Sequence, residues 1–266
     1  MFEVIGERIN TTRKDVNEAV SNRDANYIQE DVKAQQAGGA TYIDVNAGSR
    51  AGSEKEDMAW LLKVVQQAAE VPLCLDSPST EVLEIAYSMV QQRPMVNSIS
   101  LETSRYEPML SFLRGKDCDV VALCMDDSGT PSNPQEVVAR AVRLTRGLES
   151  VGIKQESIRI DPVIQPISTG DNNSVLAMES VRGIMEALPG VHTICGLSNV
   201  SFGLPQRKGI NRIFLTLLLA SGLDGAILDP LDVKIMSTLR ATRMLLGQDC
   251  YCRNFLSAVR AGNISL

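Results

Sequence analysis

The 266-residue sequence predicts a single-domain (β/α)8 TIM barrel of the α/β class, and three observations carry this prediction. Short runs rich in β-branched and other apolar residues alternate with longer amphipathic segments along the whole chain. There are eight of each, and no Gly/Ser-rich linker or block of like charge divides them. Strict alternation implies a parallel sheet, and eight repeats in a chain of this length favour its closure into a barrel.

The strands are expected where a short apolar run is bounded by polar or turn-forming residues. In order they cover residues 2–6 (FEVIG), 41–46 (TYIDVN), 72–76 (PLCLD), 95–99 (MVNSI), 119–125 (DVVALCM), 157–162 (SIRIDP), 192–197 (HTICGL) and 225–229 (GAILD). An open doubly wound sheet is the structural alternative. Such a sheet usually carries a glycine-rich nucleotide loop after its first strand, whereas residues 6–10 (GERIN) contain a single glycine, so the barrel is favoured.

The segments between the strands place apolar residues at intervals of three and four, which is the helical period. Helices are expected over residues 11–37, 53–70, 79–92, 102–116, 134–151, 174–188, 207–221 and 231–247. Residues 251–261 are expected to form an extra terminal helix.

Composition excludes several classes of function. The chain has 26 Lys and Arg against 32 Asp and Glu, a net charge of −6, which argues against a nucleic-acid-binding surface. No apolar run approaches the ~20 residues of a membrane span, and the N-terminus lacks a basic region followed by an apolar one. We therefore expect a cytoplasmic protein with no membrane partner.

Cysteine and histidine usage limits the chemistry further. The six cysteines are too few for a disulfide framework, and the four in apolar runs are expected to be buried thiols; the pair Cys250 and Cys252 alone is a weak zinc signal. His192 is the single histidine and is expected at the start of the seventh strand, away from the mouth of the barrel. Multi-histidine metal sites are thereby excluded, a triad or Cys-His pair would need His192 itself, and no metal site is predicted.

The carboxyl ends of the predicted strands carry carboxylates and carboxamides. They are Glu7, Asn10, Asp44, Asn46, Asp76, Asn97, Asp126, Asp161, Asn199 and Asp229. Asp and Asn also cap helices and favour turns, which is the alternative reading of any one of them. Because strand ends of such barrels converge on one cavity, this ring predicts a site for a flat, nitrogen-rich heterocycle with adjacent N–H donors.

Six segments then resemble the pterin-binding, corrinoid-dependent methyltransferases. They are residues 5–10 (IGERIN), 42–46 (YIDVN), 73–77 (LCLDS), 95–98 (MVNS), 160–162 (IDP) and 196–201 (GLSNVS), in matching order over essentially the whole chain. The family includes methyltetrahydrofolate:corrinoid/iron-sulfur protein methyltransferases and the tetrahydrofolate methyltransferases of corrinoid-dependent demethylase systems. The resemblance implies that residues 1–266 form one pterin-binding barrel domain.

The resemblance also implies roles for individual residues. Asp161 would bind the amino and ring N–H groups of the pterin, with Asp76 and Asn97 along the same edge. Asn199 would approach N-5, so Asn199 and Asp76 are the expected catalytic residues. The remaining expected site residues organise the mouth, shape its wall or supply a nearby positive charge, and are Glu7, Asp44, Gly196, Ser198 and Arg207. Residues 201–206 depart from the acetogen-type pattern of the family.

The function implied is methyl transfer between a corrinoid protein carrying methylcobalamin and N-5 of tetrahydrofolate, in the direction of methyltetrahydrofolate as in demethylation. The corrinoid is expected on a partner protein, because His192 does not lie in the D-x-H-x-x-G motif of corrinoid carriers. Relatives of this kind are commonly homodimers. The alternatives are transfer in the opposite direction, a dihydropteroate synthase-like reaction, and a folate-binding component without turnover.

Overall fold

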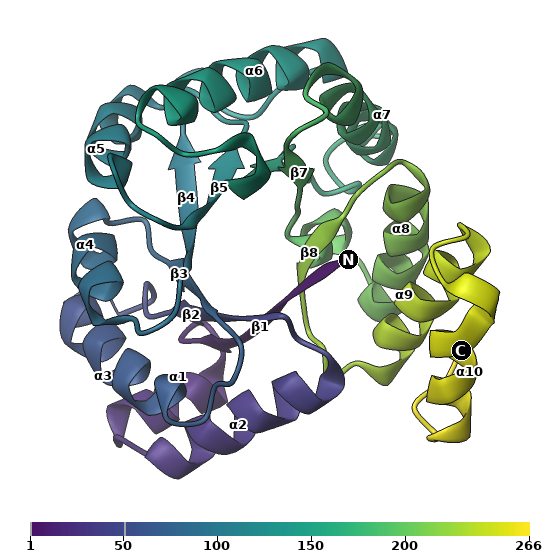
Figure 1. Cartoon of the computed structure of the whole chain (residues 1–266), viewed down its shortest axis with the longest axis horizontal. Coiled ribbons are helices and arrows are strands. Elements are labelled where there is room, and N and C mark those ends of the chain that lie inside the picture. The colour runs from purple at the N-terminus through teal and green to yellow at the C-terminus, as the bar shows by residue number, and fades with distance from the viewer. Residues whose placement is uncertain (1, 51) are drawn as a thin grey trace.

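Eight parallel strands form the inner ring of the molecule (Figure 1). In the computed structural model, which describes residues 2–50 and 52–266, they are β1 (Glu3–Asn10), β2 (Tyr42–Asn46), β3 (Leu73–Asp76), β4 (Met95–Ser100), β5 (Asp119–Leu123), β6 (Ile158–Asp161), β7 (His192–Thr193) and β8 (Gly225–Leu228). Neighbouring strands follow the order β7-β6-β5-β4-β3-β2-β1-β8. A single bridge between Gly196 and Ile227 joins the two ends of this order, and the Ile227 N–H donates to the Cys195 carbonyl at 2.8 Å. The predicted barrel is therefore confirmed.

Helices surround this ring (Figure 1). The described residues contain ten α-helices: α1 (Lys14–Ser21), α2 (Ala25–Gly38), α3 (Glu54–Gln66), α4 (Thr80–Met89), α5 (Thr103–Leu113), α6 (Pro134–Ser150), α7 (Asn173–Ala187), α8 (Arg207–Ala220), α9 (Val233–Leu245) and α10 (Arg253–Arg260). Short 3-10 helices are η1 (Gln155–Ser157), η2 (Leu197–Ser201) and η3 (Cys250–Cys252). The terminal α10 lies outside the ring beside α9 (Figure 1).

Several predicted boundaries were wrong. The expected helix over residues 11–37 is two helices, because Arg23 adopts a left-handed conformation (φ 54°) and the Asp24 side chain then caps α2. The first strand runs on to Asn10, so Glu7 lies inside a strand instead of after it. The seventh strand ends at Thr193, four residues early, because residues 194–196 make only isolated backbone pairings with Ile160 and Ile227 before the chain turns into η2.

The barrel interior is layered, since side chains two residues apart on a strand point to the same face. A middle apolar layer contains Ile5, Cys74, Met95, Val121 and Ile194, each no more than 1% exposed. Larger apolar clusters fill the space between the sheet and the helices. The middle layer separates two polar ends of the barrel, one at the amino ends of the strands and one at the carboxyl ends.

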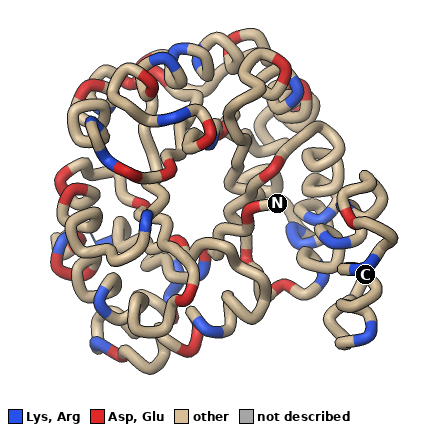
Figure 2. Tube along the Cα trace, in the orientation of Figure 1, with Lys and Arg blue, Asp and Glu red and all other residues tan. Residues whose placement is uncertain are grey.

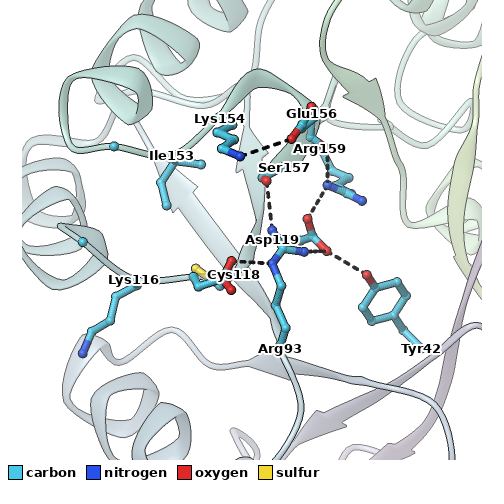
Figure 3. Close-up of a pocket in the computed structure, with 13 residues that line it drawn as sticks. Tyr42, Arg93, Lys116, Cys118, Asp119, Ile153, Lys154, Glu156, Ser157 and Arg159 are labelled. Atoms are coloured by element: carbon cyan, nitrogen blue, oxygen red, sulfur yellow. Dashed lines mark hydrogen bonds and ion pairs between the residues drawn. The ribbon is translucent and has the colours of Figure 1, made fainter.

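The amino-end layer is an ion-pair network (Figure 3). Asp119 accepts from Arg93, Arg159 and the Tyr42 hydroxyl at 2.6–2.7 Å, and Arg159 also pairs with Glu3 at 2.7 Å. These residues border a cavity of about 660 Å³, but their charges are already paired with one another. At this end of a barrel such a network supports stability, not chemistry.

His192 lies at the same end, at the start of β7, as the sequence predicted, and its ring contacts the Asp224 carboxylate at 2.7 Å. Four cysteines, Cys74, Cys118, Cys124 and Cys195, are buried, as expected. On the outer helices, acidic and basic segments are interspersed (Figure 2). Within the described part of the chain, no helix is both long and apolar enough to cross a membrane.

Candidate functional site

Strand register places three polar residues side by side on β2, β3 and β4. Asn46 and Asp76 are the last residues of β2 and β3, whereas Asn97 lies inside β4, which runs on to Ser100. Asn46 is paired with Asp76, and Asp76 with Asn97. Asp76 follows the interior residue Cys74 by two positions, so it also faces the inside of the barrel. The Asn46 amide donates to the Asp76 carboxylate at 2.7 Å. The result is a row of amide, carboxylate and amide across three neighbouring strands.

A second carboxyl group lies one layer below this row. Asp44 is 2% exposed, is paired in register with Cys74, and its Oδ1 has no hydrogen-bond partner in the described structure. Burial raises the pKa of Asp44 well above its ordinary value, and the negative charge of Asp76 raises this pKa further. Two nearby carboxyls do not both ionise easily. Burial raises the pKa of Asp76 as well, while the hydrogen bond from Asn46 and the charge of Arg105 lower it.

Asp161, at the end of β6, is a buried carboxylate that receives backbone hydrogen bonds. It is 8% exposed and accepts the Val163 N–H at 2.8 Å. Burial raises its pKa to about 6, while hydrogen bonds from the backbone of Val163 and Gly196 act in the opposite direction. No Lys or Arg among the described residues forms an ion pair with it. At neutral pH this anion is suited to a ligand that brings its own N–H donors.

The turn after β7 places Asn199 beside Gly196, whose backbone contacts Asp161. Asn199 lies in η2 with an exposed side chain, and its amide nitrogen is near Gly196. A Cβ at Gly196 would come within 3.1 Å of the Asn199 Nδ2, which is tighter than ordinary contact. Gly196 thus gives the Asn199 amide room directly beside the backbone that contacts Asp161.

Glu7, Ser198 and Arg207 border a cavity of about 330 Å³ at the same mouth. Burial raises the pKa of Glu7 to about 7, the nearby Asp229 carboxylate adds to this, and the arginines Arg13, Arg207 and Arg8 oppose it. Arg207 donates to the Ser198 carbonyl at 2.8 Å and to the Ser201 hydroxyl at 3.1 Å. Its guanidinium therefore fixes the conformation of η2.

Another cavity, of about 400 Å³, contains Asp76 and Asn97 and brings in Arg105 from α5. Arg105 was missed by the sequence analysis. A signal was available, because Arg105 lies in the first turn of α5, where the helix dipole disfavours a positive charge. A basic residue at that position indicates a specific partner.

Other strand-end residues serve the local structure instead. Asn10 accepts the backbone N–H and the hydroxyl of Thr12, at 3.0 and 2.7 Å, and so caps a turn. Asp126 pairs with the buried Arg140 at 2.9 Å. The side chain of Asn10 therefore caps a turn, and that of Asp126 forms an ion pair.

In the described ranges 2–50 and 52–266, no group of three or more His, Cys, Asp and Glu side chains is arranged to bind a metal ion. His192, the one imidazole available as a cobalt ligand, lies at the opposite end of the barrel against Asp224. The donor set at the mouth therefore suits hydrogen bonding to an organic ligand.

Comparison with known proteins gives the following matches. Residues 6–229 match the family described as pterin binding enzyme. The chain is 35% identical over 263 residues to the methylcorrinoid:tetrahydrofolate methyltransferase of Eubacterium limosum, covering 98% of this chain and 97% of that protein. It is 31% identical over 237 residues to the methionine synthase of Mycobacterium tuberculosis, covering 84% of this chain and 20% of that larger protein.

Among solved structures, a dihydropteroate synthase from Xanthomonas albilineans has a TM-score of 0.71 at 17% identity, covering 93% of each chain. At this identity the likeness supports the fold alone.

Proposed function

The chain belongs to the pterin binding enzyme family, and we propose that it transfers a methyl group from a methylcorrinoid protein to N-5 of tetrahydrofolate. The observation that carries this proposal is the pair of carboxylates at the barrel mouth: the half-buried Asp76 in its row of amides, and the buried Asp161, which has no cationic partner among the described residues. Each can accept two N–H donors from one edge of a pterin. The near full-length similarity to the E. limosum enzyme supports the choice of reaction and its direction.

We assign binding roles to the residues around these carboxylates. Asp161 accepts the amino and ring N–H groups of the pterin, while Asp76 and Asn97 bond along the same edge. Asn199 reaches N-5 from η2, where its exposed amide can donate or accept. The other residues support these four. Asp44 lies buried below the binding residues, Gly196 and Ser198 form part of the wall of the site, and Glu7 and Arg207 lie at its rim.

Methyl transfer here is an in-line displacement that needs no enzyme nucleophile. The N-5 lone pair forms the new N–C bond, the cobalt–carbon bond breaks with its electron pair left on the corrinoid, and the N-5 proton goes to solvent. N-5 gains positive charge on the way. The protein contributes position, through the carboxylates that orient the pterin, and electrostatic stabilisation, through neutral Asn199 and acidic Glu7.

The methylcorrinoid enters as a substrate on a separate protein. No described residue of this chain is placed to ligate cobalt, because His192 faces Asp224 at the other end of the barrel. The partner must therefore present its corrinoid at the mouth, above Asn199.

The direct test mixes purified protein with methylcobalamin and tetrahydrofolate, and follows the corrinoid absorbance together with 5-methyltetrahydrofolate by mass spectrometry. We expect enzyme-dependent formation of 5-methyltetrahydrofolate. Faster reaction of 5-methyltetrahydrofolate with cob(I)alamin would reverse the assigned direction. Tetrahydrofolate binding without turnover in either direction would indicate a folate-binding component, and formation of dihydropteroate from its precursors would indicate a synthase.

We further propose a cytoplasmic homodimer that does not bind nucleic acid. The net charge of −6 supports the last point. Exposed apolar side chains on three neighbouring helices support the dimer: Ile213 and Leu217 on α8, Leu245 on α9, and Leu256 and Val259 on α10. Sedimentation equilibrium decides the oligomeric state, and a monomer at micromolar concentration would refute this proposal.

A further inference from the structure

Arg105 makes an unusual set of hydrogen bonds at the edge of the site. Its Nε donates to the Ser98 carbonyl at 2.8 Å and its Nη2 to the Ser77 carbonyl at 2.9 Å, while Nη1 donates to the Pro78 carbonyl. All three acceptors are backbone oxygens, and within residues 2–50 and 52–266 Arg105 forms no salt bridge. Its position in the first turn of α5 opposes the helix dipole, so helix stability does not explain it.

The three carbonyls belong to the two segments that carry Asp76 and Asn97. Ser77 and Pro78 directly follow Asp76 at the end of β3, and Ser98 directly follows Asn97 in β4. One backbone bond already joins these segments, from the Ser77 N–H to the Asn97 carbonyl at 3.2 Å. The planar guanidinium adds a bridge between them, with one hydrogen bond to Ser98 and two to Ser77 and Pro78, a geometry that a lysine ammonium on a flexible stem does not reproduce.

The charge of Arg105 also bears on Asp76. The titratable groups that face Asp76 are Asp44 on β2 and Glu54 on α3, both acids, together with Cys74 on β3 and Arg105 on α5. Arg105 is the one cation of this set within the described structure. Burial raises the pKa of Asp76, and the hydrogen bond from Asn46 and the charge of Arg105 lower it. Glu102, at the start of α5, faces Arg105.

We propose that Arg105 is a positioning residue for folate: it fixes Asp76 and Asn97 relative to each other and keeps a positive charge beside the Asp76 carboxylate. This rests on the proposed function, because it assumes that the two side chains bind one edge of a pterin. Arg105 need not touch the ligand.

Two variants separate geometry from charge. Arg105→Gln removes the charge and most of the hydrogen bonds to the three carbonyls. We expect the Kd of this variant for tetrahydrofolate to rise about tenfold, which is the size of effect expected from losing one or two charge-assisted hydrogen bonds. Arg105→Lys keeps the charge and loses the planar geometry, so we expect a smaller loss of affinity. Arg93→Gln is the matched control, since Arg93 also uses three donors but at the opposite end of the barrel. It should lower the melting temperature and leave the Kd unchanged.

Carboxyl carbon-13 NMR of the free protein gives a readout that a merely structural role would not move. With the Asp76 signal assigned by Asp76→Asn, we expect its titration to shift to higher pH in Arg105→Gln, to shift little in Arg105→Lys, and not to shift in Arg93→Gln. The Asp161 titration, near pH 6, should stay in place in all three, because Arg105 is not among the groups that act on Asp161.

The outcomes distinguish this inference from the proposed function. If the unsubstituted protein fails to bind tetrahydrofolate, the proposed function is wrong. If it binds, but both Arg105 variants keep its affinity and its Asp76 titration, the role of Arg105 is refuted and the function stands. Should Arg105→Gln fail to fold, Arg105→Lys decides: an affinity equal to that of the unsubstituted protein overturns the positioning role.

Discussion

Asp161→Asn is expected to stabilise the protein while weakening folate binding. The pKa of Asp161 is raised by burial to about 6 in the folded protein, against an ordinary value of 3.8. The folded state therefore binds more protons than the unfolded state between these two values, and stability falls as pH rises through that window. Above it, the buried charge costs about 3 kcal/mol, because each pH unit that separates the folded and unfolded pKa values corresponds to about 1.4 kcal/mol.

The substitution removes that cost and one hydrogen bond. The asparagine oxygen can accept one backbone N–H, from Val163 or Gly196, but its amide nitrogen cannot accept the other. With about 1 kcal/mol lost for that bond, the net gain near pH 7.5 is about 2 kcal/mol, or roughly 4–8 °C in melting temperature. At pH 4.5 the charge costs only about 1 kcal/mol, so the gain should vanish.

Thermal and urea unfolding at pH 7.5 and 4.5, with calorimetric titration of tetrahydrofolate at pH 7.5, measure both effects. We expect Kd to rise about 100-fold, because a charge-assisted pair with the pterin is lost. Asp126→Asn is the control, an Asp whose pKa is lowered, first by the Ser128 hydroxyl. It should destabilise slightly at pH 7.5 and leave binding intact. An Asp161→Asn protein that is no more stable at pH 7.5, or that binds folate normally, would refute the reasoning.

The remaining predictions concern the reaction and the metal content. Asn199→Ala should lower the rate of methyl transfer about 10–100-fold and change the Kd for tetrahydrofolate less than about threefold, because the amide acts mainly at N-5 during transfer. Equal losses in the single-turnover rate and in the binding affinity would count against this role. Glu7 has a pKa of about 7, so the rate should rise as Glu7 ionises through that pH and become flat in Glu7→Gln; an unchanged pH–rate profile would exclude Glu7 from this role. Elemental analysis of the purified protein should find neither cobalt nor zinc at stoichiometric level, and one equivalent of either would contradict the assigned site.

Much of the barrel could be predicted because its signals are local. Alternating strands and amphipathic helices, and a polar residue at each strand end, are visible within windows of about ten to eighteen residues. Asp76 was correctly placed at the end of a strand on that basis, but Asn97, expected at a strand end, lies inside β4, where register still pairs it with Asp76. The early end of β7 was not visible, because it depends on the turn into η2 and on the bridge from Gly196 to Ile227.

The position of Arg105 at the start of a predicted helix was a visible signal, but the groups that its guanidinium contacts could not be predicted, for the same reason. Its acceptors are backbone carbonyls 7 and 28 residues away, and any residue type offers a backbone carbonyl. Asp44 was expected at the mouth, and its burial one layer lower follows from the direction and length of β2 in the closed sheet. Local patterns identify which residues are polar, and the closed barrel decides which of them meet.

A crystal structure of the protein with tetrahydrofolate tests the central claim most directly. The account predicts a pterin ring in the mouth of the barrel, with its amino and ring N–H groups within hydrogen-bond distance of the Asp161 carboxylate and the rest of that edge against Asp76 and Asn97. A pterin bound elsewhere, such as in the cavity beside Asp119 at the opposite end of the strands, would contradict it.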